Sequence, residues 1–342
     1  MQGGIAHGGR LIEARRLFPH APAPFIDLST GINPCPYPVG SLPDTLFTRL
    51  PELEALDALQ STAAEAYGAG DPAMVVAAPG TQILISLLPH LLGHGHATIL
   101  GPTYAEHEAA WRAAGAQVVE EHTPDAFLRT ATHAGGAAIL CNPNNPDGRR
   151  CEAGTLLALA DTMARKGGVL VCDEAFADLE APDPGLAPYL PRSGLLILRS
   201  FGKSYGLAGL RLGFLLASPE LARRIRIALG PWAVSGPALA VGRAALADQA
   251  WRQASAARLQ RGGDRLDAML GAAGFGCAGG TKLFRLFRGS AARTTFRCLG
   301  EAGLLTRRFA YDPDLLRFGL PGSEPDWTRL QAALADLTAR AR

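Results

Sequence analysis

The stretch at residues 200–213 reads SFGKSYGLAGLRLG and follows an apolar run, residues 195–198, that predicts a buried strand. Lys203 is therefore expected in a glycine-rich turn at the end of a strand. An amine in such a place can be partly desolvated, which keeps more of it neutral and nucleophilic, as Schiff-base chemistry requires. Ser200 and Arg211 flank the lysine, and a hydroxyl and a guanidinium can share one phosphate. The stretch thus predicts a nucleophilic lysine beside a phosphate site.

Two nucleotide-binding motifs are alternative interpretations of the glycines, and the spacing disfavours both. A P-loop at Lys203 would need a glycine where Ile197 stands. The segment 68–73 (GAGDPA) loosely matches a dinucleotide fingerprint, but it precedes a predicted strand, and Pro72 disfavours a helix start there. We therefore set both motifs aside.

Composition indicates an ordinary enzyme. A chain of 342 residues with 48% hydrophobic residues can bury a large core, and we expect two lobes. The net charge of +2 gives no reason to expect nucleic acid or an anionic membrane as partner. The longest apolar stretch, residues 83–92, is interrupted by Ser86 and Pro89 and is too short to span a bilayer.

The six cysteines are scattered without any C-x-x-C pair. This distribution disfavours a zinc site or a disulfide framework and is typical of a reducing compartment. The first residues do not form a basic and apolar secretion signal. We therefore expect a cytoplasmic protein without a metal site.

Short apolar runs alternate with helical patterns through the middle of the chain, which predicts an α/β fold. Their near-continuous hydrophobicity indicates a sheet that is covered on both faces. The expected strands are residues 74–77, 97–100, 137–141, 169–172, 195–198 and 213–216.

Polar and aromatic groups follow five of these runs directly. Open α/β sheets bind ligands at the carboxyl ends of their strands, so we expect these groups to form one site. In chain order they are Gly80, Thr81 and Gln82; Tyr104; Asn145; Asp173; and Ser200 with Lys203.

Lys203 with its flanking residues, and Asp173 followed by Glu-Ala-Phe, resemble the aspartate-aminotransferase-type enzymes of fold type I, which use pyridoxal 5'-phosphate (PLP). The resemblance implies a PLP-dependent transferase fold: a large domain with a mostly parallel seven-stranded sheet and a small α+β domain from both chain ends. It also implies a homodimer. Because composition changes near residues 231–237, we expect an N-terminal arm and part of the small domain at 1–48, the large domain at 49–232 and the small C-terminal domain at 233–342.

Each residue of the expected site has a role if the ligand is PLP. Lys203 would hold the cofactor, and Asp173 would keep the ring nitrogen protonated so that the ring accepts electrons. Lys203 or Tyr205 would return the proton to Cα. The other cofactor contacts would be a phosphate site at Gly80, Thr81, Gln82, Ser200 and Arg211, a stacking ring at Tyr104, and a hydrogen bond from Asn145 to the phenolic oxygen.

The chain start, His7-Gly8-Gly9 and then FIDLSTGINP at residues 25–34, is similar to the threonine-phosphate decarboxylases of cobalamin biosynthesis. Those enzymes convert L-threonine O-3-phosphate to (R)-1-aminopropan-2-yl phosphate and carbon dioxide. The resemblance implies a phosphorylated amino acid as substrate. It would contact His7, Gly8, Gly31, Asn145, Arg307 and Arg317, with Arg308 as an alternative to Arg307.

The alternative interpretation is a histidinol-phosphate aminotransferase or a related class I/II aminotransferase. Those enzymes usually carry Tyr-Pro where this chain has Leu50-Pro51, and a tyrosine where it has Phe176. Both differences favour the decarboxylase without excluding the aminotransferase.

Overall fold

The computed structural model describes residues 8–180 and 185–340. The chain divides into two compact units. Unit 1 combines the N-terminal residues up to Pro36 with the residues from Ala254 onward, and unit 2 is the continuous segment from Tyr37 to Gln253. The composition change at residues 231–237 lies inside unit 2, where a loop leads into the helix that begins at Gly236. The division between the units instead falls within the long helix α11 (Gln249–Ala272).

Unit 2 contains a seven-stranded sheet in the order β2-β8-β7-β6-β5-β3-β4. All its pairs are parallel except those of β8, which runs antiparallel to β2 and β7. The strands are β2 (Val75–Ala78), β3 (His96–Leu100), β4 (Gln117–Glu121), β5 (Ala137–Cys141), β6 (Val169–Asp173), β7 (Leu195–Arg199) and β8 (Gly213–Leu216). Every expected strand is present within a residue or two of its expected bounds. The sequence did not predict β4, because this edge strand buries only Val118 and shows no continuous apolar run.

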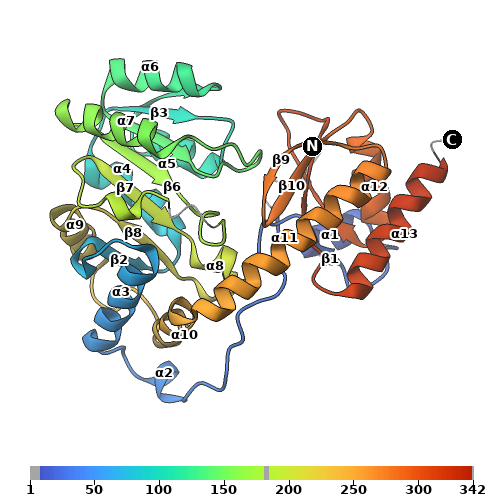
Figure 1. Ribbon diagram of the computed structural model, residues 1–342, viewed down its shortest axis with the longest axis horizontal. Helices are drawn as coiled ribbons and strands as arrows, with labels where there is room; N and C mark the ends of the chain where they lie inside the picture. Colours follow the sequence, from blue (N-terminus) through green and yellow to red (C-terminus); the bar gives the residue numbers. More distant parts are fainter. Residues whose placement is uncertain (1–7, 181–184, 341–342) are drawn as a thin grey trace. The chain divides into compact units, whose positions relative to one another are not determined.

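Helices cover both faces of this sheet (Figure 1). Alternate strand residues face opposite layers: in β7, Leu195 and Ile197 join one apolar cluster, and Leu196 and Leu198 join the other. The first layer is α3 (Leu53–Tyr67), α6 (Pro124–Ala134), α7 (Ala153–Arg165) and α10 (Gly236–Ala247), and the second is α4 (Thr81–Leu92), α5 (Ala105–Ala113) and α9 (Pro219–Leu229). Shorter elements of unit 2 are α2 (Thr45–Thr48), α8 (Phe201–Ser204) and the 3₁₀ turns η1 (Pro72–Met74), η2 (Ala187–Tyr189) and η3 (Ala208–Leu210).

Unit 1 is a smaller α+β body built from both chain ends. Its antiparallel sheet has the order β12-β13-β10-β9, and a two-stranded parallel sheet joins β1 to β11. The strands are β1 (Ile26–Asp27), β9 (Gly276–Thr281), β10 (Phe284–Arg288), β11 (Leu304–Leu305), β12 (Arg307–Arg308) and β13 (Leu315–Gly319). The helices are α1 (Leu11–Leu17), most of α11, α12 (Ala292–Glu301) and α13 (Glu324–Arg340).

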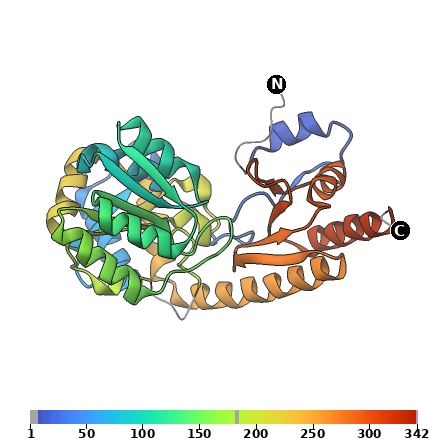
Figure 2. The same cartoon turned by 90° about the horizontal axis from the view of Figure 1, so that it is seen from above.

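Figure 2 shows α11 and α13 side by side in unit 1. The Arg265 guanidinium of α11 lies 4.5 Å from the centre of the Trp327 ring of α13 and 2.7 Å from Glu324. Trp327, Leu330 and Leu334 form a buried apolar stripe on α13. No helix in the described part of the chain is both long enough and apolar enough to cross a bilayer. The fold is therefore the expected one, a large α/β body with a mostly parallel seven-stranded sheet and a smaller α+β body.

Candidate active site

A cavity of about 160 Å³ lies in unit 2 at the carboxyl ends of the parallel strands. It brings together the residues that the sequence predicts as cofactor contacts: Gly80, Thr81, Gln82, Tyr104, Asn145, Asp173, Ser200, Lys203 and Arg211. Ile85, Cys141, Ala175, Phe176, Gly202, Ala208 and Leu212 complete the wall. The strands determine this convergence, because parallel strands place their carboxyl ends at the same edge of the sheet.

One end of the cavity is built to bind an anion. Gly80 precedes α4 with a φ of 85°, and no side chain caps the first turn of this helix, so its N–H groups are available to a ligand. A Cβ atom at Gly80 would lie 2.6 Å from Nη2 of Arg211, so only glycine allows this guanidinium so close to the helix start. Arg211 itself has a left-handed φ of 56°, and its Nη1 donates to the Ala208 carbonyl at 3.2 Å. Backbone amides and a guanidinium here fit a phosphate group.

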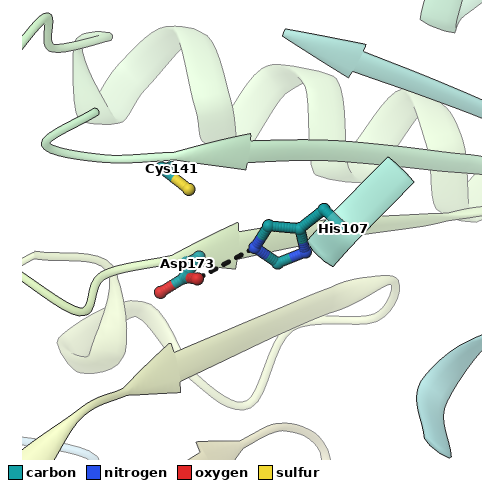
Figure 3. Close-up of side chains that lie close together, drawn as sticks. All are labelled: His107, Cys141 and Asp173. Carbon is teal, nitrogen blue, oxygen red and sulfur yellow. Dashed lines mark hydrogen bonds and ion pairs between the residues drawn. The ribbon is translucent and has the colours of Figure 1, made fainter. Parts of the chain in front are cut away.

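Asp173 and His107 form a buried pair beside the cavity (Figure 3). Nε2 of His107 lies 2.9 Å from Oδ2 of Asp173, and Oδ1 of Asp173 accepts the Ala175 N–H at 3.0 Å. Burial alone would lower the pKa of His107, but its hydrogen bonds to Asp173 and Cys141 outweigh burial and raise this pKa to about 10. The imidazole is therefore protonated at neutral pH, and its positive charge lies against the Asp173 carboxylate.

The same pair belongs to the group of side chains that could ligate a metal. Donor atoms of His107, Cys141 and Asp173 all lie within 4.8 Å of one another and come from a helix and two strands (Figure 3). The short contact between the imidazole and the carboxylate already satisfies both groups as an ion pair. A metal would have to break this contact, so the geometry fits a carboxylate that faces the cavity better than a metal site.

His107 is the site residue that sequence reasoning missed. No catalytic motif contains it, and a lone histidine in a helical pattern carries no chemical signal. The sequence offers one indication of its place: His107 comes three residues after Tyr104, and residues three apart lie on the same face of a helix. Their rings meet edge to face at 6.1 Å. Tyr104 is fixed further by its hydroxyl, which donates to Oε1 of Gln82 at 3.0 Å.

The three asparagines of residues 142–146 have different roles. Asn142 exchanges hydrogen bonds with the backbone of Cys151 at 2.9 and 3.2 Å. Asn144 is buried and accepts from the Thr103 hydroxyl at 2.7 Å. Only Asn145 lines the cavity. Asn142 and Asn144 hold the loop, and Asn145 lies in the cavity wall.

The structure separates the two proton donors that the sequence left open. Lys203 lines the cavity, with Nζ 5.8 Å from the centre of the Phe176 ring. Tyr205 does not: its ring is fully buried and stacked between Phe201 and Trp251, with centroid distances of 4.3 and 5.5 Å. Burial also raises the pKa of Tyr205. Of the two candidate proton donors, only Lys203 therefore lines the cavity.

The two arginines expected to bind substrate are neighbours in unit 1. Arg307 of β12 pairs directly with Arg317 of β13, so both side chains leave the sheet on one face. Arg308 pairs with Leu316 on the other face, where its guanidinium lies 4.0 Å from the centre of the Phe296 ring. The structure therefore favours Arg307 over Arg308 as the second substrate arginine.

Arg317 also holds the chain start that the sequence singled out. Its Nη2 donates to the Ser29 carbonyl at 2.8 Å, and the Ser29 hydroxyl accepts the Gly9 N–H at the same distance. A Cβ at Gly8 would lie 2.5 Å from the Ser29 carbonyl oxygen, so glycine is required at this position. Gly31, two residues after Ser29, is buried. The remaining expected contact, His7, lies outside the described residues.

Comparison with known proteins assigns the chain to a family. The model of the family described as aminotransferase class I and II matches residues 43–336. The chain belongs to this family. This membership confirms the expected resemblance to the aminotransferase-type enzymes.

Within the class I and II aminotransferases, relatives that are similar over nearly the full length include two threonine-phosphate decarboxylases. Threonine-phosphate decarboxylase of Sinorhizobium sp is 42% identical over 98% of this chain and 99% of its own length. Threonine-phosphate decarboxylase of Pseudomonas aeruginosa is 40% identical over 96% of this chain and 97% of its own length. The crystal structure of L-threonine-O-3-phosphate decarboxylase from Porphyromonas gingivalis superposes with a TM-score of 0.71 at 22% identity, covering 91% of this chain and 98% of that one.

Proposed function

We propose that this protein is a PLP-dependent decarboxylase that converts L-threonine O-3-phosphate to (R)-1-aminopropan-2-yl phosphate and carbon dioxide. The observation that carries the proposal is the same-face pair of Arg307 and Arg317. A substrate with a carboxylate and a phosphate needs two cationic partners, and guanidinium groups bind both kinds of anion through paired hydrogen bonds. The names of the two near full-length relatives support this reaction, which belongs to cobalamin biosynthesis in the enzymes that the chain start resembles.

The cavity of unit 2 fits PLP residue by residue. The start of α4, Ser200 and Arg211 would bind the phosphate, and the Lys203 amine would hold the cofactor covalently. Asp173, which is paired with His107, would bind the ring nitrogen in its protonated form. PLP supplies an electron sink when bound, which accepts the electron pair left on Cα as carbon dioxide departs.

The remaining steps depend on the chain's own groups. We assign the substrate carboxylate to Arg317 and the phosphate to Arg307, with His7, Gly8 and Gly31 as further contacts. Binding energy from the phosphate, remote from the reacting bond, would orient the carboxylate for departure. Lys203 would then donate a proton to Cα, which replaces the lost carboxylate and leaves the amine product.

One assay tests this proposal against the aminotransferase alternative. Purified PLP-loaded protein is given L-threonine O-3-phosphate, and carbon dioxide, the amine product and keto acid are measured. We expect carbon dioxide and amine in equal amounts with no keto acid, whether or not 2-oxoglutarate is added. Histidinol phosphate with 2-oxoglutarate is the matched control and should give no product. Keto acid without carbon dioxide would overturn the decarboxylase and favour the aminotransferase.

We further propose that a second copy of the chain is the protein's partner. A groove of about 640 Å³ in unit 2 lies between α3 and the segment after α9. Large apolar side chains line it and are strongly exposed: Leu53 is 65% exposed, Ile227 67% and Trp232 54%. Contiguous exposed apolar surface of this kind is typical of protein interfaces, which supports a homodimer.

A further inference from the structure

A buried charged cluster in unit 2 has no place in the proposed reaction steps. It consists of Glu174, Asp178 and Arg199, whose side chains are 0%, 1% and 3% exposed. Nη2 of Arg199 lies 2.7 Å from Oε2 of Glu174, and Nη1 lies 3.0 Å from Oδ1 of Asp178. One guanidinium therefore bridges two carboxylates inside the core.

Such a cluster is a poor way to gain stability. Removing three charges from water is costly, and well-packed apolar side chains often replace buried ion networks without loss of stability. Burial raises the pKa of Asp178, while the nearby Arg199 charge lowers it. The cluster therefore calls for an explanation other than stability.

Its place in the chain supplies one. Glu174 directly follows Asp173 at the end of β6, and Arg199 directly precedes Ser200 at the end of β7. The bridge thus joins the end of β6, which carries Asp173, to the end of β7, which leads into the helix of Lys203. The Glu174 N–H donates to the Leu198 carbonyl at 2.9 Å alongside it.

The cluster is also held rigidly on its outer sides. Oε1 of Glu174 accepts the Leu186 N–H at 2.8 Å. A Cβ at Gly185 would lie 2.4 Å from Oε2 of Glu174 and 2.6 Å from Nη2 of Arg199. The Arg199 guanidinium lies 5.0 Å from the centre of the Tyr67 ring. These contacts leave the ion pairs little freedom to shift.

We infer that Arg199 is a positioning residue, which fixes Asp173 relative to Lys203 by bridging Glu174 and Asp178. PLP is rigid, and the proposed function requires Asp173 and Lys203 to bind opposite ends of it. An error in their spacing would weaken both contacts at once. The planar fork of arginine binds two carboxylates in fixed directions, whereas a lysine ammonium is a single point charge. The inference rests on the proposed cofactor and not on the proposed substrate.

Arg199→Lys tests the inference, because it keeps the charge and removes the fork. We expect PLP to bind the PLP-free protein at least tenfold more weakly. About tenfold is the smaller of the affinity losses typical when a residue that supports a metal-ligating side chain is changed, and Arg199 supports Asp173 in a comparable way. We also expect the pH midpoint of the visible absorbance of the loaded protein to shift, since that absorbance reports the contacts of Lys203 and Asp173. The turnover number kcat should fall while KM changes little. Arg192→Lys is the matched control, since Arg192 binds Asp161 at 2.6 Å on the surface of the same unit.

Two outcomes would overturn the inference. The first is an Arg199→Lys protein that is less stable to heat but has the PLP affinity, absorbance midpoint and kcat of the wild type. This result would show that the cluster only stabilises the fold. If this variant does not fold, Glu174→Gln replaces it, because glutamine keeps the shape and one acceptor. A Glu174→Gln protein that matches the wild type in all three measurements is the second overturning outcome. Absence of PLP binding at Lys203 in the wild type would instead contradict the proposed function.

Discussion

Arg317 is a cation in surroundings that disfavour its charge. It is only 6% exposed, and burial together with the neighbouring Arg307 lowers its pKa to about 10, against the opposing effect of Asp27. An anion bound beside Arg317 and Arg307 would stabilise both guanidinium groups. The pair is therefore organised for an anionic ligand before the ligand arrives.

The two arginines of β12 provide a matched test of substrate binding. Arg307→Ala should lower kcat/KM for L-threonine O-3-phosphate by about ten- to a hundredfold, because it removes a charge-assisted contact worth roughly 1.5–3 kcal/mol. Arg308→Ala should change it little, since that side chain leaves the opposite face of the sheet. We expect unphosphorylated threonine to be a poor substrate that is affected little by either change. Equal losses in both variants would show that Arg307 does not bind the phosphate.

The raised pKa of His107 predicts a pH dependence of stability. Since this pKa is about 10 in the folded protein and 6.5 ordinarily, the folded state holds the extra proton between these values. The stabilisation is complete below about pH 6.5 and is lost as pH rises through about 10, with a slope of at most about 1.4 kcal/mol per pH unit. Denaturant unfolding of the PLP-free protein should show this slope, and His107→Gln should lack it. A wild type and variant with parallel pH profiles would exclude a protonated His107.

Sequence patterns predicted the residues that touch the cavity better than those that support them. Asp173 ends a strand, and Lys203 and Asn145 each lie four residues beyond the end of one, so strand ends set the position of all three. His107 approaches the site from a helix through tertiary packing, which no local pattern encodes. Tyr205 is the converse case: it lies two residues from Lys203, but the short helix α8 turns its ring into the core.

At the scale of elements, α4 shows how a helix start becomes a binding site. Glycines flank it at both ends with positive φ, Gly80 at 85° and Gly93 at 67°. They differ in surroundings: a Cβ at Gly80 would strike Arg211, whereas a Cβ at Gly93 would meet nothing within 4 Å. Both glycines therefore have a backbone conformation that strains other residues, but only Gly80 lies against the Arg211 guanidinium.

Alanine at each end of α4 separates these two effects. Gly80→Ala and Gly93→Ala should each lower the free energy of unfolding by about 1 kcal/mol, because alanine is strained at positive φ. Only Gly80→Ala should weaken PLP binding, since its methyl group displaces Arg211. Calorimetric titration of the PLP-free proteins measures the difference. Similar PLP affinities in both variants would remove the start of α4 from the phosphate site.

The strands differ in how far the sequence could predict them. Buried runs such as residues 137–141 and 195–198 are apolar throughout and were readily predicted. The edge strand β4 was not, because solvent on its outer side removes the pattern. The reversed direction of β8 depends on the path of the chain between strands and leaves no mark in its four residues.

At the scale of the whole molecule, the groove beside α3 predicts the state of assembly. Ile227→Asp would put a charge on a 67% exposed side chain of this groove, and we expect it to shift the protein from dimer to monomer. Val119→Asp is the control, because Val119 is 38% exposed on β4, at the opposite edge of the sheet from β2. Light scattering after size-exclusion chromatography measures both. A wild-type monomer, or a dimeric Ile227→Asp protein, would contradict the proposal.

Unit 1 takes its strands from both ends of the chain, which sets an order of events during synthesis on the ribosome. Unit 2 is one continuous segment, so it can complete its sheet once Gln253 has emerged. The earlier residues cannot: Ile26 of β1 pairs with Leu304, and the carbonyl of Ser29 accepts a hydrogen bond from Arg317. The first part of the chain to leave the ribosome is therefore among the last to fold, and a nascent chain stopped before Leu304 should hold a finished PLP cavity with an unfolded leading segment.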